Sequence, residues 1–157
     1  MSEFATSEAL YEKTFEIRWA DCDANQHMRH SAYSDLCAHT RVGFLDKIGM
    51  NQQWFRKNGI GPVLFKEQTE YFREVFMGEE VKVTVETGEP TGSKKSVCIV
   101  NKVYKPNGEL AAQHQVIVGW MDIKQRKVVE LPEKIRQMYF VEKDMLDAKA
   151  PEAEEMA

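Results

Sequence analysis

Residues 21–30 read Asp21-Cys22-Asp23-Ala24-Asn25-Gln26-His27-Met28-Arg29-His30, and Ser31 and Tyr33 follow them. The run places two carboxylates, two imidazoles and an amide between an alternating segment and an amphipathic one. A polar group that becomes buried costs several kcal/mol unless it is paired. This density of titratable groups at one junction therefore indicates an active site rather than a simple connector.

The segments on either side of this run have different periodicities. Residues 15–20 alternate between apolar and other side chains, which predicts a strand with one buried face that ends at Asp21 to Asp23. From Ser31 onward apolar residues recur three and four positions apart, and Gly49 supplies a stop. The pattern predicts an amphipathic helix over residues 31–48 with Ser31 as its N-cap.

The rest of the chain predicts four more strands and two short helices. Alternation and turn residues place strands near 63–72, 81–85, 97–103 and 111–121, a hairpin at Pro106-Asn107-Gly108, and helices near 51–57 and 134–140. Five strands with one long helix after the first favour an α+β fold. In it, an antiparallel five-stranded sheet wraps around the helix.

Composition limits the class of protein. The 157 residues suit one domain, expected over residues 1–147, and the acidic, apolar-poor stretch 148–157 predicts a disordered tail. A net charge of −4 and a pI near 5.6 argue against a nucleic-acid-binding protein. No segment approaches the roughly 20 apolar residues that cross a bilayer, and no leader pattern opens the chain. We expect a cytoplasmic protein with no membrane partner.

Three cysteines without a Cys-x-x-Cys spacing predict neither a disulfide framework nor a structural zinc site. Cys37 and Cys98 are expected in the core. Cys22 is either a nucleophile or a packed thiol, and its place at a strand end favours packing. The histidines show neither His-x-x-x-His nor His-x-His spacing, so we expect no metal site.

Three stretches in this order resemble the hotdog-fold thioesterases of the 4-hydroxybenzoyl-CoA thioesterase type. The first is Asp21, Asp23, His27 and Tyr33. The second and third are Tyr71-Phe72-Arg73-Glu74-Val75-Phe76-Met77-Gly78-Glu79-Glu80 and Lys94-Lys95-Ser96. The resemblance covers residues 11–140. Some members have Gly-His-Val-Asn-Asn at residues 26–30; the different run in this chain is similar to that of a subgroup of acyl-CoA thioesterases.

The resemblance implies a hotdog fold and the hydrolysis of an acyl-CoA thioester to a free acid and coenzyme A. No cofactor is implied, because coenzyme A is part of the substrate. Asp23 matches the catalytic aspartate and would act as nucleophile or as general base for water. His27 would orient this carboxylate or bind substrate, or else it is a structural histidine. Asp21 is expected to pair with Arg18 or with the backbone.

The start of the predicted helix offers donors for an oxyanion. Backbone N–H groups of the first turn, around His30 to Ala32, have no partner within the helix and carry partial positive charge. They can stabilise the developing charge of a thioester carbonyl. We therefore count His30, Ser31 and Tyr33 among the substrate-binding residues.

Further candidates lie later in the chain. Glu67 is a reserve catalytic carboxylate. It lies on the opposite strand face from Glu70, so one of the two should point inward, although a solvated face or an interface ion pair explains them as well. By family position, Lys94, Lys95 and Ser96 would meet the phosphates of coenzyme A, with Arg126 and Lys127 as alternatives.

The resemblance also implies a homodimer or homotetramer, because in the family two units pair edge to edge and build each active site at their interface. Two other functions stay open. One is a non-catalytic protein that binds acyl thioesters, and the other is a hotdog hydratase or dehydratase that acts on the acyl chain.

Overall fold

The computed structural model of the chain describes residues 9–142. Its elements are β1 (Tyr11–Glu16), the 3-10 helix η2 (Trp19–Asp21), α1 (His30–Lys47), α2 (Gln52–Asn58), β2 (Ile60–Tyr71), β3 (Glu80–Thr87), β4 (Ser96–Tyr104), β5 (Leu110–Asp122), β6 (Lys127–Val129) and α3 (Glu133–Glu142). The strands pair in the order β1-β3-β4-β5-β2, and β6 pairs with β5. The predicted α+β class and the five main strands are confirmed. The expected tail over residues 148–157 lies outside the described residues.

Two compact units divide the described chain. The first holds residues 9–44, 68–86 and 100–115, and the second holds residues 45–67, 87–99 and 116–142. The single domain expected over residues 1–147 stays a prediction. Within residues 9–142, no helix has the length and apolar character needed to cross a membrane.

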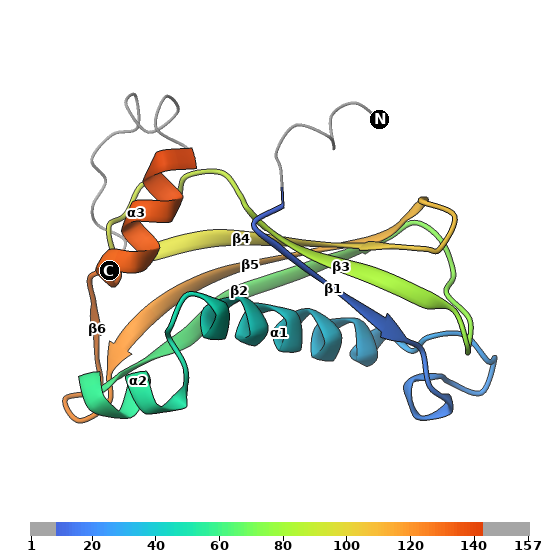
Figure 1. Cartoon of the computed structure of the whole chain (residues 1–157), viewed down its shortest axis with the longest axis horizontal. Coiled ribbons are helices and arrows are strands. Elements are labelled where there is room, and N and C mark those ends of the chain that lie inside the picture. Colours follow the sequence, from blue (N-terminus) through green and yellow to red (C-terminus); the bar gives the residue numbers. More distant parts are fainter. Residues whose placement is uncertain (1–8, 143–157) are drawn as a thin grey trace. The chain divides into compact units, whose positions relative to one another are not determined.

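In the first unit the long helix α1 packs on the sheet. Its buried residues recur three and four positions apart, as the sequence predicted: Ala32, Tyr33, Cys37, Thr40 and Phe44. They share a core with strand residues that include Val81, Val83, Val103, Ala111 and Ala112. Antiparallel β1 and β3 lie side by side, with Tyr11 opposite Val85 (Figure 1). A Cβ on Gly43 would lie only 2.6 Å from the Tyr11 hydroxyl, so a larger residue here would have to displace the Tyr11 side chain.

The second unit has its own core, formed mainly by Met50, Val97, Val116, Val118, Trp120, Leu131 and Ile135. Helix α2 starts at the N-cap Asn51, whose side chain accepts a hydrogen bond from Trp54 N, and ends at Gly59 in a left-handed conformation. Lys134 of α3 donates to Ile48 O at 2.8 Å. The sequence did not predict β6, because three residues are too few to show alternation.

Two predictions near the candidate site are wrong. The first strand ends at Glu16 instead of at Asp21 to Asp23, because the chain turns into η2. Trp19, assigned to the buried face of that strand, is 82% exposed. Ser31 is not the N-cap, because α1 already begins at His30; the Ser31 hydroxyl instead accepts a hydrogen bond from Arg29 Nε at 2.9 Å.

Candidate functional site

Residues 22–28 form a tight loop in the first unit. A β-bridge between Cys22 and Met28 closes the loop. Inside it, Asp23 N donates to His27 O and Gln26 N donates to Asp23 O, both at 2.9 Å. Gln26 adopts a left-handed φ of 71°, which lets the chain reverse here. The backbone therefore holds Asp23 and His27 at fixed positions next to each other.

A second segment supports this loop from outside. Met28 N donates to Val75 O at 2.7 Å. Lys105 Nζ anchors the same segment, since it lies 2.6 Å from Glu74 O and 3.1 Å from Glu79 Oε1. The site thus consists of two loops that hydrogen bonds join to each other and to the sheet.

Asp21 anchors the start of the loop. Its carboxylate accepts hydrogen bonds from Arg18 N, Nε and Nη2 at 2.9, 3.1 and 2.9 Å. These hydrogen bonds hold the pKa of the buried Asp21 carboxyl below its ordinary value, although burial opposes the shift. The predicted pairing of Asp21 with Arg18 is confirmed.

This pairing predicts a pH-dependent loss of stability in Asp21→Asn. Because the pKa of Asp21 is lower in the folded than in the unfolded protein, its ionised carboxylate stabilises the fold at pH values above the unfolded-state pKa. This stabilisation disappears as the pH falls through the folded-state pKa. At neutral pH we expect the variant to lose about 1–3 kcal/mol of unfolding free energy, as for a hydrogen bond to a charged group. Urea unfolding should show the difference shrinking below pH about 4. A difference that is equally large in acid would contradict the assignment.

Asp23 presents one carboxylate oxygen to the loop. Its Oδ1 accepts from Asn25 N at 2.9 Å and from His27 N at 3.4 Å. Its Oδ2 accepts no hydrogen bond from any described residue, and the side chain is 39% exposed. Asp23 lines a cavity of about 620 Å³ together with Trp19, Ala20, Cys22, Ala24, Gln26 and Met77. The free oxygen is available to water or to a substrate.

His27 lies between two carboxylates. Its Nδ1 is 3.9 Å from Asp23 Oδ1 and its Nε2 is 3.8 Å from Glu74 Oε2. Both distances exceed hydrogen-bond length, so the interaction is electrostatic and needs a protonated ring. The ring packs edge-on against Phe76, with centroids 5.9 Å apart.

His27 lines a second cavity. This cavity measures about 320 Å³, and its lining consists of His27, Met28, His30, Tyr33, Tyr71, Phe72, Arg73 and Glu74. The structure thus brings together three predicted site residues, His27, His30 and Tyr33, while Asp23 lines the first cavity. The sequence assigned no role to Tyr71, Arg73 and Glu74, although they belong to a stretch that matched the family.

Tyr33 is buried in the wall of the second cavity. Burial, then the nearby Tyr71, Glu74 and Glu79, raise the pKa of Tyr33 to about 12. Its ring meets that of Tyr71 edge-on, with centroids 5.1 Å apart. At neutral pH the Tyr33 hydroxyl is therefore protonated and able to donate a hydrogen bond.

The first turn of α1 offers fewer donors than predicted. Ala32 N donates to Arg29 O at 2.9 Å, so it is not available to an oxyanion. The N–H groups of His30 and Ser31 donate to no described residue. They are the remaining backbone donors at this helix start.

Cys22 is a packed thiol rather than an activated one. Its Sγ lies 3.5 Å from Arg18 O. Burial, together with the charges of Asp21 and Asp23, raises the pKa of the Cys22 thiol, which disfavours a thiolate nucleophile. Among residues 9–142, no group of three or more His, Cys, Asp and Glu side chains is placed to hold a metal ion.

The other predicted site residues belong to the second unit. Glu67 is exposed, and so is Glu70, which belongs to the first unit. The prediction that one of these two side chains points inward is therefore wrong. The reason is that β2 lies at the end of the strand order, where residues 64–68 are exposed in succession. Ser96 is buried and its hydroxyl donates to Thr91 Oγ1 at 2.9 Å. Lys94 is exposed and Lys95 is half-buried.

Comparison with known proteins agrees with this architecture. The family model described as "Thioesterase-like superfamily" matches residues 17–138. No curated protein matches the chain.

Several solved structures share the fold. The hypothetical protein SAV2348 from Staphylococcus aureus, in complex with CoA, is 19% identical with a TM-score of 0.78, over 88% of each chain. A DHNA-CoA thioesterase from Staphylococcus aureus is 19% identical with a TM-score of 0.74, over 93% of this chain and 98% of its own. The 1,4-dihydroxy-2-naphthoyl-CoA thioesterase Slr0204 from Synechocystis is 15% identical with a TM-score of 0.73, over 82% and 94%. At these identities the likeness shows the fold alone, and the predicted hotdog class is confirmed.

Proposed function

Since the chain belongs to the thioesterase-like superfamily, we propose that it hydrolyses an acyl-CoA thioester to a free acid and coenzyme A. The observation that carries the proposal is the Asp23 carboxylate. The loop holds its Oδ1 through backbone N–H groups and leaves its Oδ2 without a hydrogen bond from a described residue, and Asp23 lines a cavity. Two similar structures are of thioesterases that act on aromatic acyl-CoAs, and a third contains CoA, which supports this substrate class.

In the proposed reaction the free oxygen of Asp23 removes a proton from water as the water attacks the thioester carbonyl, or it attacks the carbonyl itself and forms an acyl–Asp23 anhydride that water then hydrolyses. The N–H groups of His30 and Ser31 are the proposed donors to the developing oxyanion, and Tyr33 is proposed to bind the substrate from the second cavity. The C–S bond breaks, and the thiolate of coenzyme A takes up the proton that the hydrolysing water loses. His27 orients the Asp23 carboxylate, and Glu67 stays the reserve carboxylate.

Recognition of coenzyme A is proposed for the turn before β4. Lys94 and Lys95 supply positive charge for the phosphates, which a lysine can meet through a flexible stem. Lys95 N donates to Ser93 Oγ at 3.0 Å, which shapes the turn. The buried Ser96 supports the same turn through Thr91 and does not offer its hydroxyl to a ligand.

We propose that the chain works as a homodimer or homotetramer. β2 is twelve residues long, ends the strand order and exposes Leu64 and Phe65. A long exposed edge strand with apolar side chains is a template for pairing with another chain. Light scattering should give the mass of two or four chains. A mass of one chain at micromolar concentration would contradict the proposal.

Thiol release tests the function. The protein is mixed with short, long and aromatic acyl-CoAs, and free coenzyme A is followed with a disulfide reagent. We expect turnover on at least one member of the panel. Tight acyl-CoA binding without turnover would instead support a non-catalytic binding protein. Changes in the acyl chain without thiol release would support a hydratase or dehydratase.

A further inference from the structure

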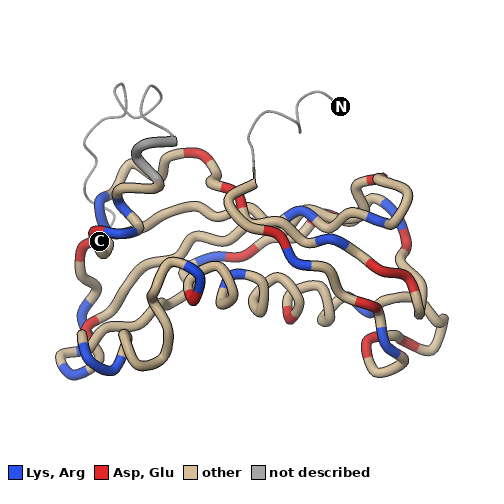
Figure 2. The backbone as a smooth tube through the Cα atoms, viewed as in Figure 1, with Lys and Arg blue, Asp and Glu red and all other residues tan. Residues whose placement is uncertain are grey.

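Five cations gather at one place on the second unit. They are Arg56 and Lys57 in the last turn of α2, and Lys124, Arg126 and Lys127 in and after the turn between β5 and β6. All five are exposed. Figure 2 shows them as the blue segments of α2 and of the β5–β6 turn. We call these five residues the basic surface.

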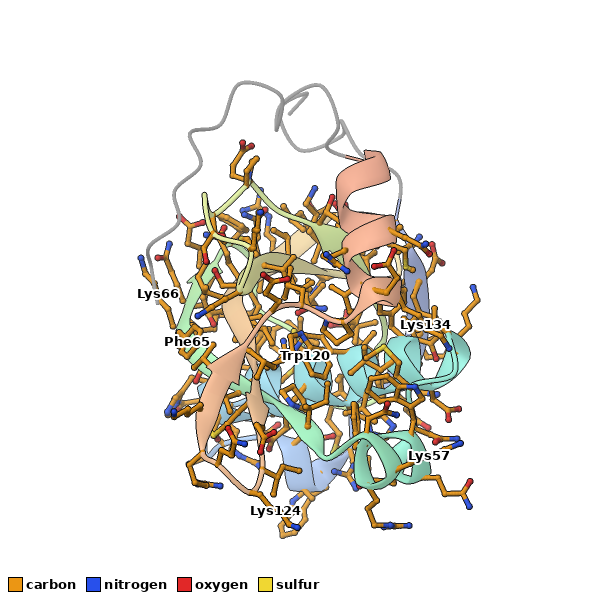
Figure 3. The ribbon with its side chains drawn as sticks, turned by 90° about the vertical axis from the view of Figure 1, so that its left-hand side faces the viewer. Lys57, Phe65, Lys66, Trp120, Lys124 and Lys134 are labelled. Atoms are coloured by element: carbon orange, nitrogen blue, oxygen red, sulfur yellow. The ribbon has the colours of Figure 1, made fainter. Side chains whose placement is uncertain are left out.

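Hydrogen bonds fix the two halves of the basic surface against each other. Ile123 N donates to Gly59 O at 2.9 Å, which ties the β5–β6 turn to the end of α2. Within the turn, Asp122 Oδ1 accepts from Lys124 N and Gln125 N at 3.0 and 2.8 Å. Figure 3 shows Lys57 and Lys124 at the lower end of this unit. The cations are therefore held by an ordered framework.

Neighbouring acids do not neutralise this surface. None of the five side chains forms an ion pair in the part of the chain that the structure describes. One carboxylate oxygen of the neighbouring Asp122 accepts hydrogen bonds from backbone N–H groups. Residues 47–66 and 123–129 contain no Asp or Glu, although the whole chain has a net charge of −4. The dipole of α2 favours Arg56 and Lys57 at its C-terminus, but it does not account for the three cations of the turn.

An apolar side chain lies within this positive surface. Ile123 is 48% exposed and stands in sequence directly before Lys124. Protein interfaces combine apolar contacts with a charged rim, and complementary charge speeds association. A bilayer fits less well, since stable attachment needs a second strong signal and this chain offers one exposed aliphatic residue here.

We propose that the basic surface docks an acidic carrier protein that presents its acyl group as a thioester. The proposal rests on the proposed function and extends it from coenzyme A to a protein-bound substrate. The acyl group of such a carrier is attached as a thioester to the end of a long, flexible phosphopantetheine arm. The surface that binds the carrier body therefore need not adjoin the residues that hydrolyse the thioester.

The test compares one acyl group on two carriers, coenzyme A and a purified acidic acyl carrier protein. The variant Lys57→Gln/Lys124→Gln removes two charges from the basic surface. Lys47→Gln/Lys82→Gln removes two exposed charges elsewhere, so both variants have the same net charge. We expect the first variant to lose about tenfold in kcat/KM for the carrier-protein substrate only, because steering by complementary charge is lost. Added salt should narrow the difference, because it screens exposed charges.

Several results would overturn the proposal. They are an equal loss of kcat/KM for the coenzyme A substrate, an equal loss of kcat/KM in the control variant, or no loss of kcat/KM at all. If Lys57→Gln/Lys124→Gln lost binding to phosphatidylserine vesicles while its kcat/KM for the carrier-protein substrate stayed unchanged, the surface would be assigned to membranes instead. Fluorescence anisotropy of a labelled carrier protein measures docking without catalysis. If Lys57→Gln/Lys124→Gln binds the labelled carrier protein more weakly than wild type, the proposal is supported even when wild type hydrolyses neither substrate. In that case only the proposed function fails.

Discussion

Asp23→Asn is expected to lower kcat for acyl-CoA hydrolysis by about 10²–10⁴-fold while the affinity for acyl-CoA stays near that of wild type. Asn keeps the size of Asp and still offers an oxygen to Asn25 N, so the loop should keep its shape. It cannot accept a proton from water or attack the thioester as a carboxylate does. Thiol release gives kcat, and titration with a non-hydrolysable acyl-CoA analogue gives the affinity.

The matched control is Asp35→Asn, which removes an exposed carboxylate from α1. It should hydrolyse acyl-CoA at the wild-type rate. If Asp23→Asn also hydrolyses normally, Asp23 is not the catalytic carboxylate, and Glu67→Gln becomes the next variant to measure. If both binding and turnover disappear in Asp23→Asn, a collapsed loop explains the result, and circular dichroism and thermal unfolding should reveal it.

Glu86→Leu is expected to cost about 3–5 kcal/mol of unfolding free energy. Glu86 and Lys102 are both buried in the first unit, with Lys102 Nζ 3.1 Å from Glu86 Oε1. Thr84 Oγ1 donates to Glu86 Oε2 at 2.9 Å. Removal of the carboxylate leaves the Lys102 ammonium buried without its closest opposite charge, and this desolvated charge is the source of the loss.

The double variant Glu86→Leu/Lys102→Met removes both charges and should recover most of this loss. Glu12→Leu is the matched control, because Glu12 is paired with Lys82 on neighbouring strands but in an exposed position. Its expected cost is below about 1 kcal/mol. Chemical denaturation measures all three. A loss in Glu86→Leu no larger than in Glu12→Leu would show that the buried pair contributes little.

Elements with strong local signals could be predicted from the order of residues alone. The three- and four-residue spacing of apolar side chains predicted α1 to within one residue at each end, because a helix buries one face whatever it packs against. Asn51 and Gly59 mark the ends of α2, and Pro106-Asn107-Gly108 marks a turn, through their own backbone chemistry. The pairing of Asp21 with Arg18 is local as well, and it was predicted.

The end of the first strand and the surroundings of the candidate site became known from the folded structure. The apolar alternation continues through Trp19, past the end of β1 at Glu16, so periodicity did not show that the chain turns into η2 and exposes Trp19. The structure also places Asp23 in one cavity and Tyr33 in another, and brings Glu74 to His27. His27 and Glu74 lie far apart in the sequence. Periodicity reports which face of an element is buried, but contacts between distant loops depend on how the whole unit packs.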